Sequence, residues 1–160
     1  KTKISKLASP DDLKFLGLGF SKREGKYNPR PHKKSLKKLK LKIKAILGRS
    51  RGISLERYQT ELTTTLRGWY NYFKIGLSKT RIQTLDECTR RRIRMLYWKR
   101  WKKIKTKYEA LMKLGVNRCK AWEWANTSKG YWAIARSWIL STTLTNKRLR
   151  KHGWLCLTDL

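Results

Sequence analysis

The most regular pattern of apolar and polar positions lies between residues 53 and 76. At about 100° per residue, six apolar side chains point within about 40° of one direction: Leu55, Tyr58, Leu62, Leu66, Trp69 and Phe73. Ser54 stands directly before them, where it can cap the N-terminus of a helix. The pattern therefore predicts an amphipathic helix that buries Trp69 and Phe73.

Gly68 lies on the opposite side of this helix. A glycine in the exposed middle of a helix costs roughly 1 kcal/mol relative to alanine. A close neighbour, either another backbone or a phosphate, would explain it. We expect the side of the helix that carries Arg67, Gly68, Asn71 and Lys74 to be the one most able to meet a partner.

A second helix is predicted within residues 32–52. Lysine and apolar residues alternate from Lys38 to Lys44, a pattern typical of a strand. Five apolar residues nevertheless share one helical face: Leu36, Leu39, Ile43, Ile46 and Leu47. We therefore predict a helix, with Ser35 as its N-cap and Gly48 just after its end.

A third helix is predicted over residues 80–103, with Thr80 as a candidate N-cap. One broad face is apolar and consists of Ile82, Leu85, Ile93, Leu96, Tyr97 and Trp101. Another side carries side chains at steps of three and four residues: Arg91, Met95, Trp98 and Lys102. We expect the first face to pack against the protein and the second to meet a partner.

The two ends of the chain differ from this helical middle. Residues 13–32 predict a β-hairpin, with a first strand from Phe15 to Phe20 and a second strand that Pro29 and Pro31 confine to a sheet edge. Shorter helical segments follow Lys105, with an expected core of Leu111, Leu114, Trp122, Trp132, Ile139 and Leu144. The expected fold is mainly α, with an N-terminal β-hairpin, a three-helix bundle and a small helical C-terminal module.

The charge of the chain indicates its partner. There are 41 Lys and Arg residues against 10 Asp and Glu residues, which gives a formal net charge of +31. A polyanion is the expected partner. No stretch approaches the roughly 20 apolar residues that span a bilayer, so we expect nucleic acid rather than a membrane. We expect a cytoplasmic protein, from a bacterial cytoplasm or an organelle matrix, and a piece of a longer chain because it opens on Lys1.

The residues that could carry chemistry are few. Cys88, Cys119 and Cys156 are odd in number and form no Cys-x-x-Cys pair, so we expect neither a disulfide framework nor a structural zinc site. One metal set stays open as an alternative: Cys119, Cys156 and His152. Asp11-Asp12 is expected to be a loop pair, and Asp86-Glu87 to complement the positive end of a helix dipole. We expect no catalytic residue and no metal site in this chain.

Five segments give the chain a resemblance to a known family. They are "FLGLGF", "RSRGISLERY", "LRGWYNYF", "RRRIRMLYWKRWKK" and "SKGYWAIARS". They occur in the same order as in the C-terminal half of group II intron reverse transcriptases, the intron-encoded maturases, and the chain resembles that half over essentially its whole length. Two positions depart from the family: Ala133, where relatives often carry Arg, and Trp138, where relatives often carry Pro.

The resemblance implies three domains and a division of labour. Residues 1–32 would be the end of the reverse transcriptase palm, residues 33–104 the thumb or maturase domain X, and residues 105–160 a small DNA-binding-like domain. In the family, carboxylates of an aromatic-x-Asp-Asp box bind two Mg²⁺ ions for polymerisation. Ser9-Pro10 precedes Asp11-Asp12 here, so we expect that box, its Mg²⁺ and the RNA-directed DNA polymerase activity to belong to the parent protein and not to this chain.

The expected function is to bind intron RNA and the RNA–DNA template-primer duplex, with target DNA as a further candidate, in splicing, reverse transcription and retrohoming. The candidate nucleic-acid-binding residues are Lys33, Lys34, Lys37, Lys38, Arg49, Arg51, Arg67, Lys74, Arg90, Arg91, Arg94, Trp98, Lys102, Lys129 and Tyr131. Among them, Trp98 is the candidate for stacking on a base. A basic structural RNA-binding protein, ribosomal-like and without a maturase role, is the alternative, and the oligomeric state stays open.

Overall fold

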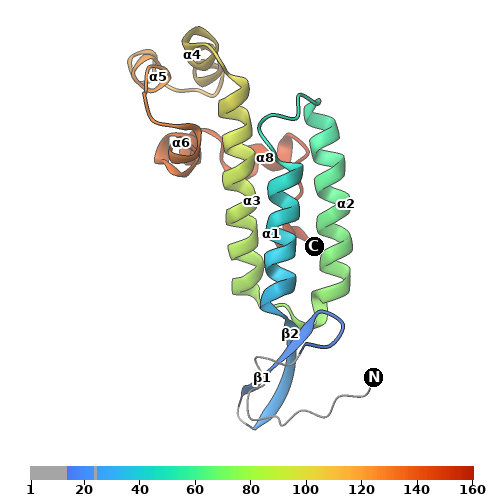
Figure 1. Cartoon of the computed structure of the whole chain (residues 1–160). Coiled ribbons are helices and arrows are strands. Elements are labelled where there is room, and N and C mark those ends of the chain that lie inside the picture. The colour runs from blue at the N-terminus through green and yellow to red at the C-terminus, as the bar shows by residue number, and fades with distance from the viewer. Residues whose placement is uncertain (1–13, 24) are drawn as a thin grey trace.

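The computed structural model describes residues 14–23 and 25–160, and it confirms a mainly α fold with an N-terminal hairpin (Figure 1). The strands are β1 (Leu18–Arg23) and β2 (Lys26–Pro31). The long helices are α1 (Lys33–Ile46), α2 (Leu55–Phe73) and α3 (Lys79–Arg100), with the 3-10 helix η1 (Lys74–Gly76) before the last. Shorter helices follow: α4 (Ile104–Lys113), α5 (Arg118–Ala125), α6 (Tyr131–Arg136), α7 (Trp138–Thr143), α8 (Asn146–Lys151) and the 3-10 helix η2 (Leu157–Asp159).

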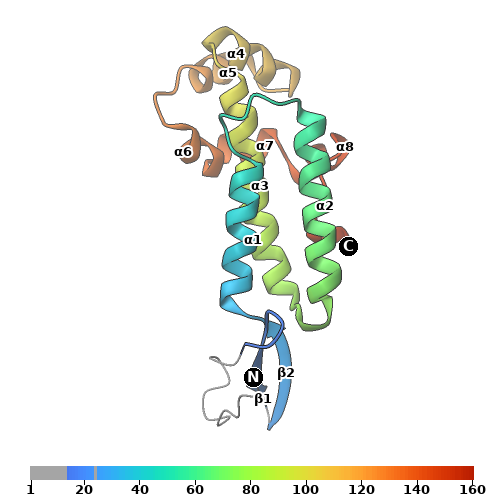
Figure 2. The same cartoon turned by 45° about the vertical axis from the view of Figure 1, so that its right-hand side comes forward.

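The three long helices form a bundle above the hairpin. α1 and α3 run away from the hairpin and α2 returns toward it (Figures 1 and 2). The predicted apolar faces of α1 and α2 meet α3 in one core, whose fully buried members include Leu47, Leu62, Leu66, Leu85, Ile93 and Leu96. Burial of one helical face therefore outweighs the strand-like alternation in α1, because only a helix brings its apolar residues to one side.

The helix starts agree with the predictions at one of three positions. Ser54 caps α2, since its Oγ accepts a hydrogen bond from the Arg57 N–H at 3.3 Å. The prediction for α1 is wrong: His32 is the N-cap and its Nδ1 accepts from the Lys34 N–H at 3.1 Å. The prediction for α3 is wrong as well, because Ser78 and not Thr80 is the N-cap. In each case a polar residue slightly upstream captures the free backbone N–H groups first.

The hairpin begins three residues later than expected. Leu16 and Gly17 have φ angles of 48° and 83°, and Phe15 and Leu18 exchange two backbone hydrogen bonds of 2.9 and 2.8 Å across them. This tight turn interrupts the predicted strand from Phe15, so that β1 starts at Leu18 and pairs antiparallel with β2. Two side chains tie the turn to the bundle: Ser35 Oγ donates to Gly17 O and Tyr72 Oη donates to Leu16 O, both at 2.7 Å.

Two glycines near the end of α2 have opposite surroundings. A Cβ at Gly76 would lie 2.7 Å from Pro29 O and 2.9 Å from Arg30 Cα, so glycine lets η1 approach β2 closely. A Cβ at Gly68 would meet no atom of the described residues within 4 Å. No neighbour among the described residues explains Gly68, and a partner outside the chain stays a prediction.

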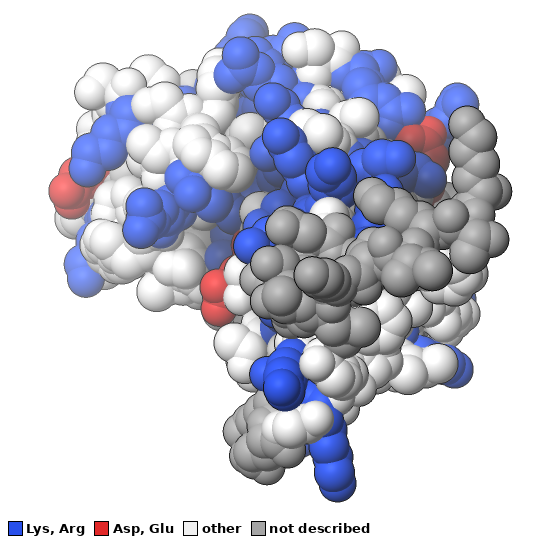
Figure 3. All heavy atoms as spheres, turned by 60° about the horizontal axis from the view of Figure 1, so that its bottom comes forward, with Lys and Arg blue, Asp and Glu red and all other residues white. Residues whose placement is uncertain are grey.

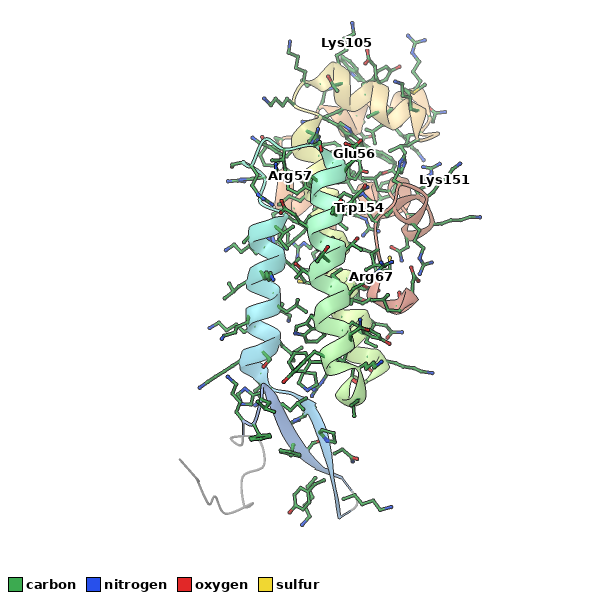
Figure 4. All side chains as sticks on the ribbon, turned by 90° about the vertical axis from the view of Figure 1, so that its right-hand side faces the viewer. Glu56, Arg57, Arg67, Lys105, Lys151 and Trp154 are labelled. Atoms are coloured by element: carbon green, nitrogen blue, oxygen red, sulfur yellow. The ribbon has the colours of Figure 1, made fainter. Side chains whose placement is uncertain are left out.

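The C-terminal helices pack against the bundle (Figure 2). α6 lies beside α3, and the expected core residues Leu111 and Leu144 are buried. The expected burial of Trp122 and Trp132 is wrong, since these side chains are 59% and 40% exposed. Trp154 is buried instead, and its Nε1–H donates to Tyr97 Oη at 3.1 Å (Figure 4). Short helices have too few turns for apolar spacing to indicate which face is covered.

η2 is fastened to α3 by Asp86. This carboxylate is buried and accepts hydrogen bonds from the Leu157 N–H at 2.7 Å, the Thr158 N–H at 3.0 Å and Thr158 Oγ1 at 2.8 Å. Asp86 therefore caps a 3-10 helix that is remote in sequence. The dipole of α3 acts mainly within the first turn of that helix, and Asp86 lies beyond this turn. The predicted dipole role is wrong for this residue.

No helix within the described residues has the length and apolar character needed to cross a membrane.

Candidate nucleic-acid interface

The solvent side of α1 is a row of lysines. The helix carries seven lysines and no acidic residue, and its apolar residues Leu39, Ile43 and Ile46 face the core. The four candidates on α1, which are Lys33, Lys34, Lys37 and Lys38, are all exposed. Figure 3 looks toward the hairpin end, where Lys and Arg side chains spread over the visible face and few acidic side chains interrupt them. This surface suits a polyanion, which can neutralise many like charges at once.

A second exposed side belongs to α2 and η1. Arg67, Gly68, Asn71 and Lys74 are all exposed, and Figure 4 shows α2 from its outer side with Arg67 projecting from its lower half. The buried side carries Phe73, whose ring centre lies 4.8 Å from that of Trp69.

The aromatic side chains of this motif split between the two sides. Phe73 is buried as predicted, whereas Trp69 is only half-buried against the core. The aromatics thus position the helix, and its smaller and charged residues face solvent.

Arg51 is committed to the protein itself. Its Nη1 and Nη2 donate to the two carboxylate oxygens of Glu61 at 2.6 and 3.1 Å, and Nη1 also donates to Ile46 O at 2.9 Å. The hydrogen bond from Arg51 lowers the pKa of the Glu61 carboxyl. Arg51 therefore holds the loop between α1 and α2 against α2, and this pairing leaves the neighbouring Arg49, which is exposed, as the freer cation of that loop.

The prediction that Trp98 stacks on a base is wrong. Trp98 is 1% exposed, its ring packs edge-on against Trp101 with centroids 5.9 Å apart, and Lys107 Nζ of α4 lies 4.9 Å from its centroid. A ring inside the core cannot reach a base. The sequence shows that α3 has a second, mixed face, but it does not show that α4 folds back over that face.

Two of the α3 arginines serve as internal ties. Arg90 lies 3.3 Å from Asp86 in an ion pair, and its side chain is only 13% exposed. Arg94 donates from Nε to Leu144 O at 3.1 Å and from Nη2 to Asn146 Oδ1 at 3.4 Å. Burial lowers the pKa of Arg94, and the nearby charge of Arg90 lowers it further. The Arg94 guanidinium therefore joins α3 to the C-terminal helices, and Arg90 pairs with the carboxylate that holds η2. Neither guanidinium is a free cation on a partner-facing surface.

Arg91 holds an aromatic residue that the sequence did not mark for binding. Its guanidinium carbon lies 3.7 Å from the ring centre of Trp132, and its Nη2 donates to Trp132 O at 3.2 Å. Burial lowers the pKa of Arg91, and the charge of Arg136 lowers it further. The segment "SKGYWAIARS" contains the signal that could have identified Trp132, because it interleaves aromatic and basic residues.

The remaining candidates surround this segment. Tyr131 is half-buried, with Lys99 Nζ 4.8 Å and the Arg49 guanidinium 5.8 Å from its ring centre. Lys102 and Lys129 are exposed. Their contact with nucleic acid stays a prediction.

The thiols and acids are dispersed. Among the described residues, no three side chains of His, Cys, Asp or Glu lie close enough together to hold a metal ion, and Cys88, Cys119 and Cys156 are free. Burial raises the pKa of the Cys156 thiol, while Cys119 is exposed. The alternative metal set of Cys119, Cys156 and His152 is therefore not assembled, and Asp11-Asp12 lies outside the described residues.

One known protein family matches the part of the chain that carries this surface. The family model of the group II intron maturase-specific domain matches residues 36–115, a range that begins in α1 and ends just after α4. No curated protein matches the chain.

Proposed function

Because the chain belongs to the family of the group II intron maturase-specific domain, we propose that it binds group II intron RNA and supports the splicing of that intron. The observation that carries the proposal is the lysine side of α1, of whose seven lysines five lie within the matched range. A helix with seven lysines and no acidic residue repels other cations, and it offers a neutral surface no electrostatic attraction. The phosphates of RNA, in contrast, neutralise its charge.

The finer parts of the proposal follow from the resemblance and from the order of the elements. The hairpin would be the end of a reverse transcriptase palm, residues 33–104 the thumb, and residues 105–160 a DNA-binding-like module. The thumb would then also grip the template-primer duplex during reverse transcription and retrohoming. We place the protein in a cytoplasm or an organelle matrix. The polymerase carboxylates and their Mg²⁺ would lie in the parent protein.

One experiment tests RNA binding and its location together. Lys34, Lys37 and Lys38 are replaced by Gln, which removes three charges from α1 and keeps a good helix former. The matched control replaces Lys105, Lys120 and Lys147, which are exposed residues of α4, α5 and α8, and Lys105 lies at the opposite end from the hairpin (Figure 4). Binding to a transcribed group II intron is measured by filter retention, and stimulation of its splicing is measured in parallel.

The α1 variant should bind the intron more weakly and stimulate its splicing less, and the control variant should stay near the parent chain. If six to ten phosphates are contacted, the affinity of the parent chain should fall by about 10³- to 10⁵-fold between 50 and 200 mM salt. Equal loss in both variants would contradict a localised interface. Equal affinity for the intron and for an arbitrary RNA duplex would favour the basic structural RNA-binding alternative.

The enzymatic part is tested separately. The chain is incubated with Mg²⁺, nucleotides and a primed RNA template, and we expect no extension of the primer. Extension by this chain alone would contradict the placement of the polymerase carboxylates in the parent protein.

A further inference from the structure

Three hollows adjoin one another along α3. The first, of about 500 Å³, lies between α3 and α6, which are neighbours in Figure 1. The second, of about 500 Å³, lies between α3 and the end of α1, and Trp132 lines both of them. The third, of about 520 Å³, lies beside the last turns of α3, and it shares Arg49 and Ser50 with the second. Because neighbouring hollows share lining residues, we treat the three as one continuous groove along α3 and call it the track.

The walls of this track are strongly cationic. Arg91 and Arg136 line the first hollow, Lys44 and Arg92 the second, and Lys99 and Lys102 the third. Among the described residues that line the three hollows, Glu87 is the only acidic one. The Nε of Arg91 is buried without a hydrogen-bond partner among the described residues. Such a wall leaves positive charge uncompensated, and a row of phosphates can compensate it.

A flat aromatic surface stands inside the track. Trp132 is 40% exposed although the guanidinium of Arg91 stacks on its ring at 3.7 Å and that of Arg92 lies 5.1 Å from its centre. The two arginines contact the indole while the residue stays exposed to solvent. Exposed aromatic rings among cations are the usual stacking platforms for unpaired bases.

We propose that this track binds an unpaired nucleic-acid strand, with its phosphates along the cationic walls and one base stacked on Trp132. Each hollow falls in the range of about 300–1,000 Å³ that holds a small ligand, so it suits a nucleotide rather than a duplex. Bases inside a duplex stack on one another and cannot reach a ring in this position. The identity of the strand as intron RNA rests on the proposed function, and single-stranded DNA shares the same chemistry.

The test compares two exposed tryptophans. Trp132→Ala removes the platform, and Trp122→Ala is the matched control because Trp122 is 59% exposed and lines none of the three hollows. Fluorescence anisotropy measures the affinity of the full chain for a short single-stranded RNA, the DNA of the same sequence, an abasic version of the RNA and an RNA duplex. Circular dichroism checks that each variant is folded.

Trp132→Ala should weaken the single-stranded RNA by about 5- to 150-fold, the range expected for one lost base stack. It should leave the abasic RNA and the duplex nearly unchanged, and Trp122→Ala should change none of them. Trp132→Phe, which keeps a ring, should recover most of the affinity. A similar loss with the DNA would assign the track to either kind of strand, and a loss with RNA alone would restrict it to RNA.

Equal affinity of Trp132→Ala and the parent chain for single-stranded RNA would overturn the inference, as would equal losses for base-bearing and abasic strands. If Trp132→Ala does not fold, Arg92→Gln decides the matter, because it removes a cation from the wall of the second hollow and should weaken both base-bearing and abasic strands. No effect of Arg92→Gln would then overturn it. The lysine variant of α1 tests the proposed function independently, since Lys34, Lys37 and Lys38 line none of the three hollows.

Discussion

Gly68 shows how a single residue can separate stability from function. It lies in the exposed middle of α2, next to Arg67 and one turn from Asn71, and a Cβ added there would meet no described atom within 4 Å. Folding therefore gains nothing from glycine at this position, and the free space beside it faces solvent on a cationic side of the molecule. Close approach of a partner backbone would explain the glycine.

Gly68→Ala should raise the free energy of unfolding by about 1 kcal/mol, because alanine is the better helix former and no clash opposes it. Urea denaturation followed by circular dichroism measures this change. The affinity for intron RNA should fall in the same variant if a phosphate backbone comes close to the glycine.

Gly76→Ala is the control for Gly68→Ala. Its Cβ would lie 2.7 Å from Pro29 O, so it should destabilise the fold. A loss of stability in Gly68→Ala would show that other atoms of the protein pack against this side of α2.

Apolar spacing predicts the long elements well, because each buries one continuous face. The predicted faces of α1 and α2 meet the core, although Leu36, Leu55 and Trp69 are only half-buried. Even the strand-like lysine alternation in α1 gives way to the helical arrangement. Spacing does not reveal which short helix will cover a polar face. α3 shows two chemical faces in the sequence, yet Trp98 on its mixed face is buried and Trp132 of α6 is exposed, the reverse of the expectation for both residues.

The same limit applies to the candidate interface. The lysines of α1 could be identified from charge alone, because the helix carries seven lysines and no acidic residue. Arg90 pairs with Asp86 one turn away on the same helix, a spacing that the sequence itself contains. Arg94 and Arg51 looked equally available in the sequence, but their acceptors lie on other elements: Leu144 O just after α7, and Glu61 on α2. Such pairings depend on tertiary packing, which periodicity does not contain.

Docking of η2 on α3 depends on one carboxylate. Asp86→Ala would leave the Leu157 and Thr158 N–H groups and the Arg90 charge without their buried partner. Loss of one partner of a buried ion pair costs about 3–5 kcal/mol. We expect a decrease of that size in the free energy of unfolding, measured by urea denaturation.

The neighbouring residue provides a matched control for Asp86→Ala. Glu87 is exposed, and Glu87→Ala should change the free energy of unfolding by no more than about 0.5 kcal/mol. Hydrogen exchange at the backbone of residues 154–160 should speed up in Asp86→Ala alone. Unchanged exchange there would show that the C-terminal segment is held by its apolar contacts without Asp86.

The whole molecule carries far more charge than its fold requires. Small domains stay soluble with a net charge of about 2–8, whereas this chain has +31. Among the described residues, ion pairs with Arg side chains involve Glu61, Asp86 and Asp159, and the chain has 41 Lys and Arg residues against 10 Asp and Glu residues, so acids cannot balance most of its cations. Self-repulsion of this size lowers the stability of the compact state. A bound polyanion would neutralise the repelling charges, so binding of a polyanion should stabilise the folded state.

This balance predicts opposite effects of salt on stability and on binding. Raising the ionic strength shortens the Debye length, to about 10 Å at 0.1 M, and so screens the repulsion between lysines while it also weakens phosphate contacts. The melting temperature of the free chain should therefore rise with sodium chloride over the same range in which its affinity for intron RNA falls. The variant with Lys34, Lys37 and Lys38 replaced by Gln should melt higher than the parent at low salt and should respond less to added salt, because three repelling charges are gone. A melting temperature that falls with salt would mean that the attraction within the ion pairs outweighs the repulsion between the cations. Relief of that repulsion could then not contribute to the free energy of RNA binding.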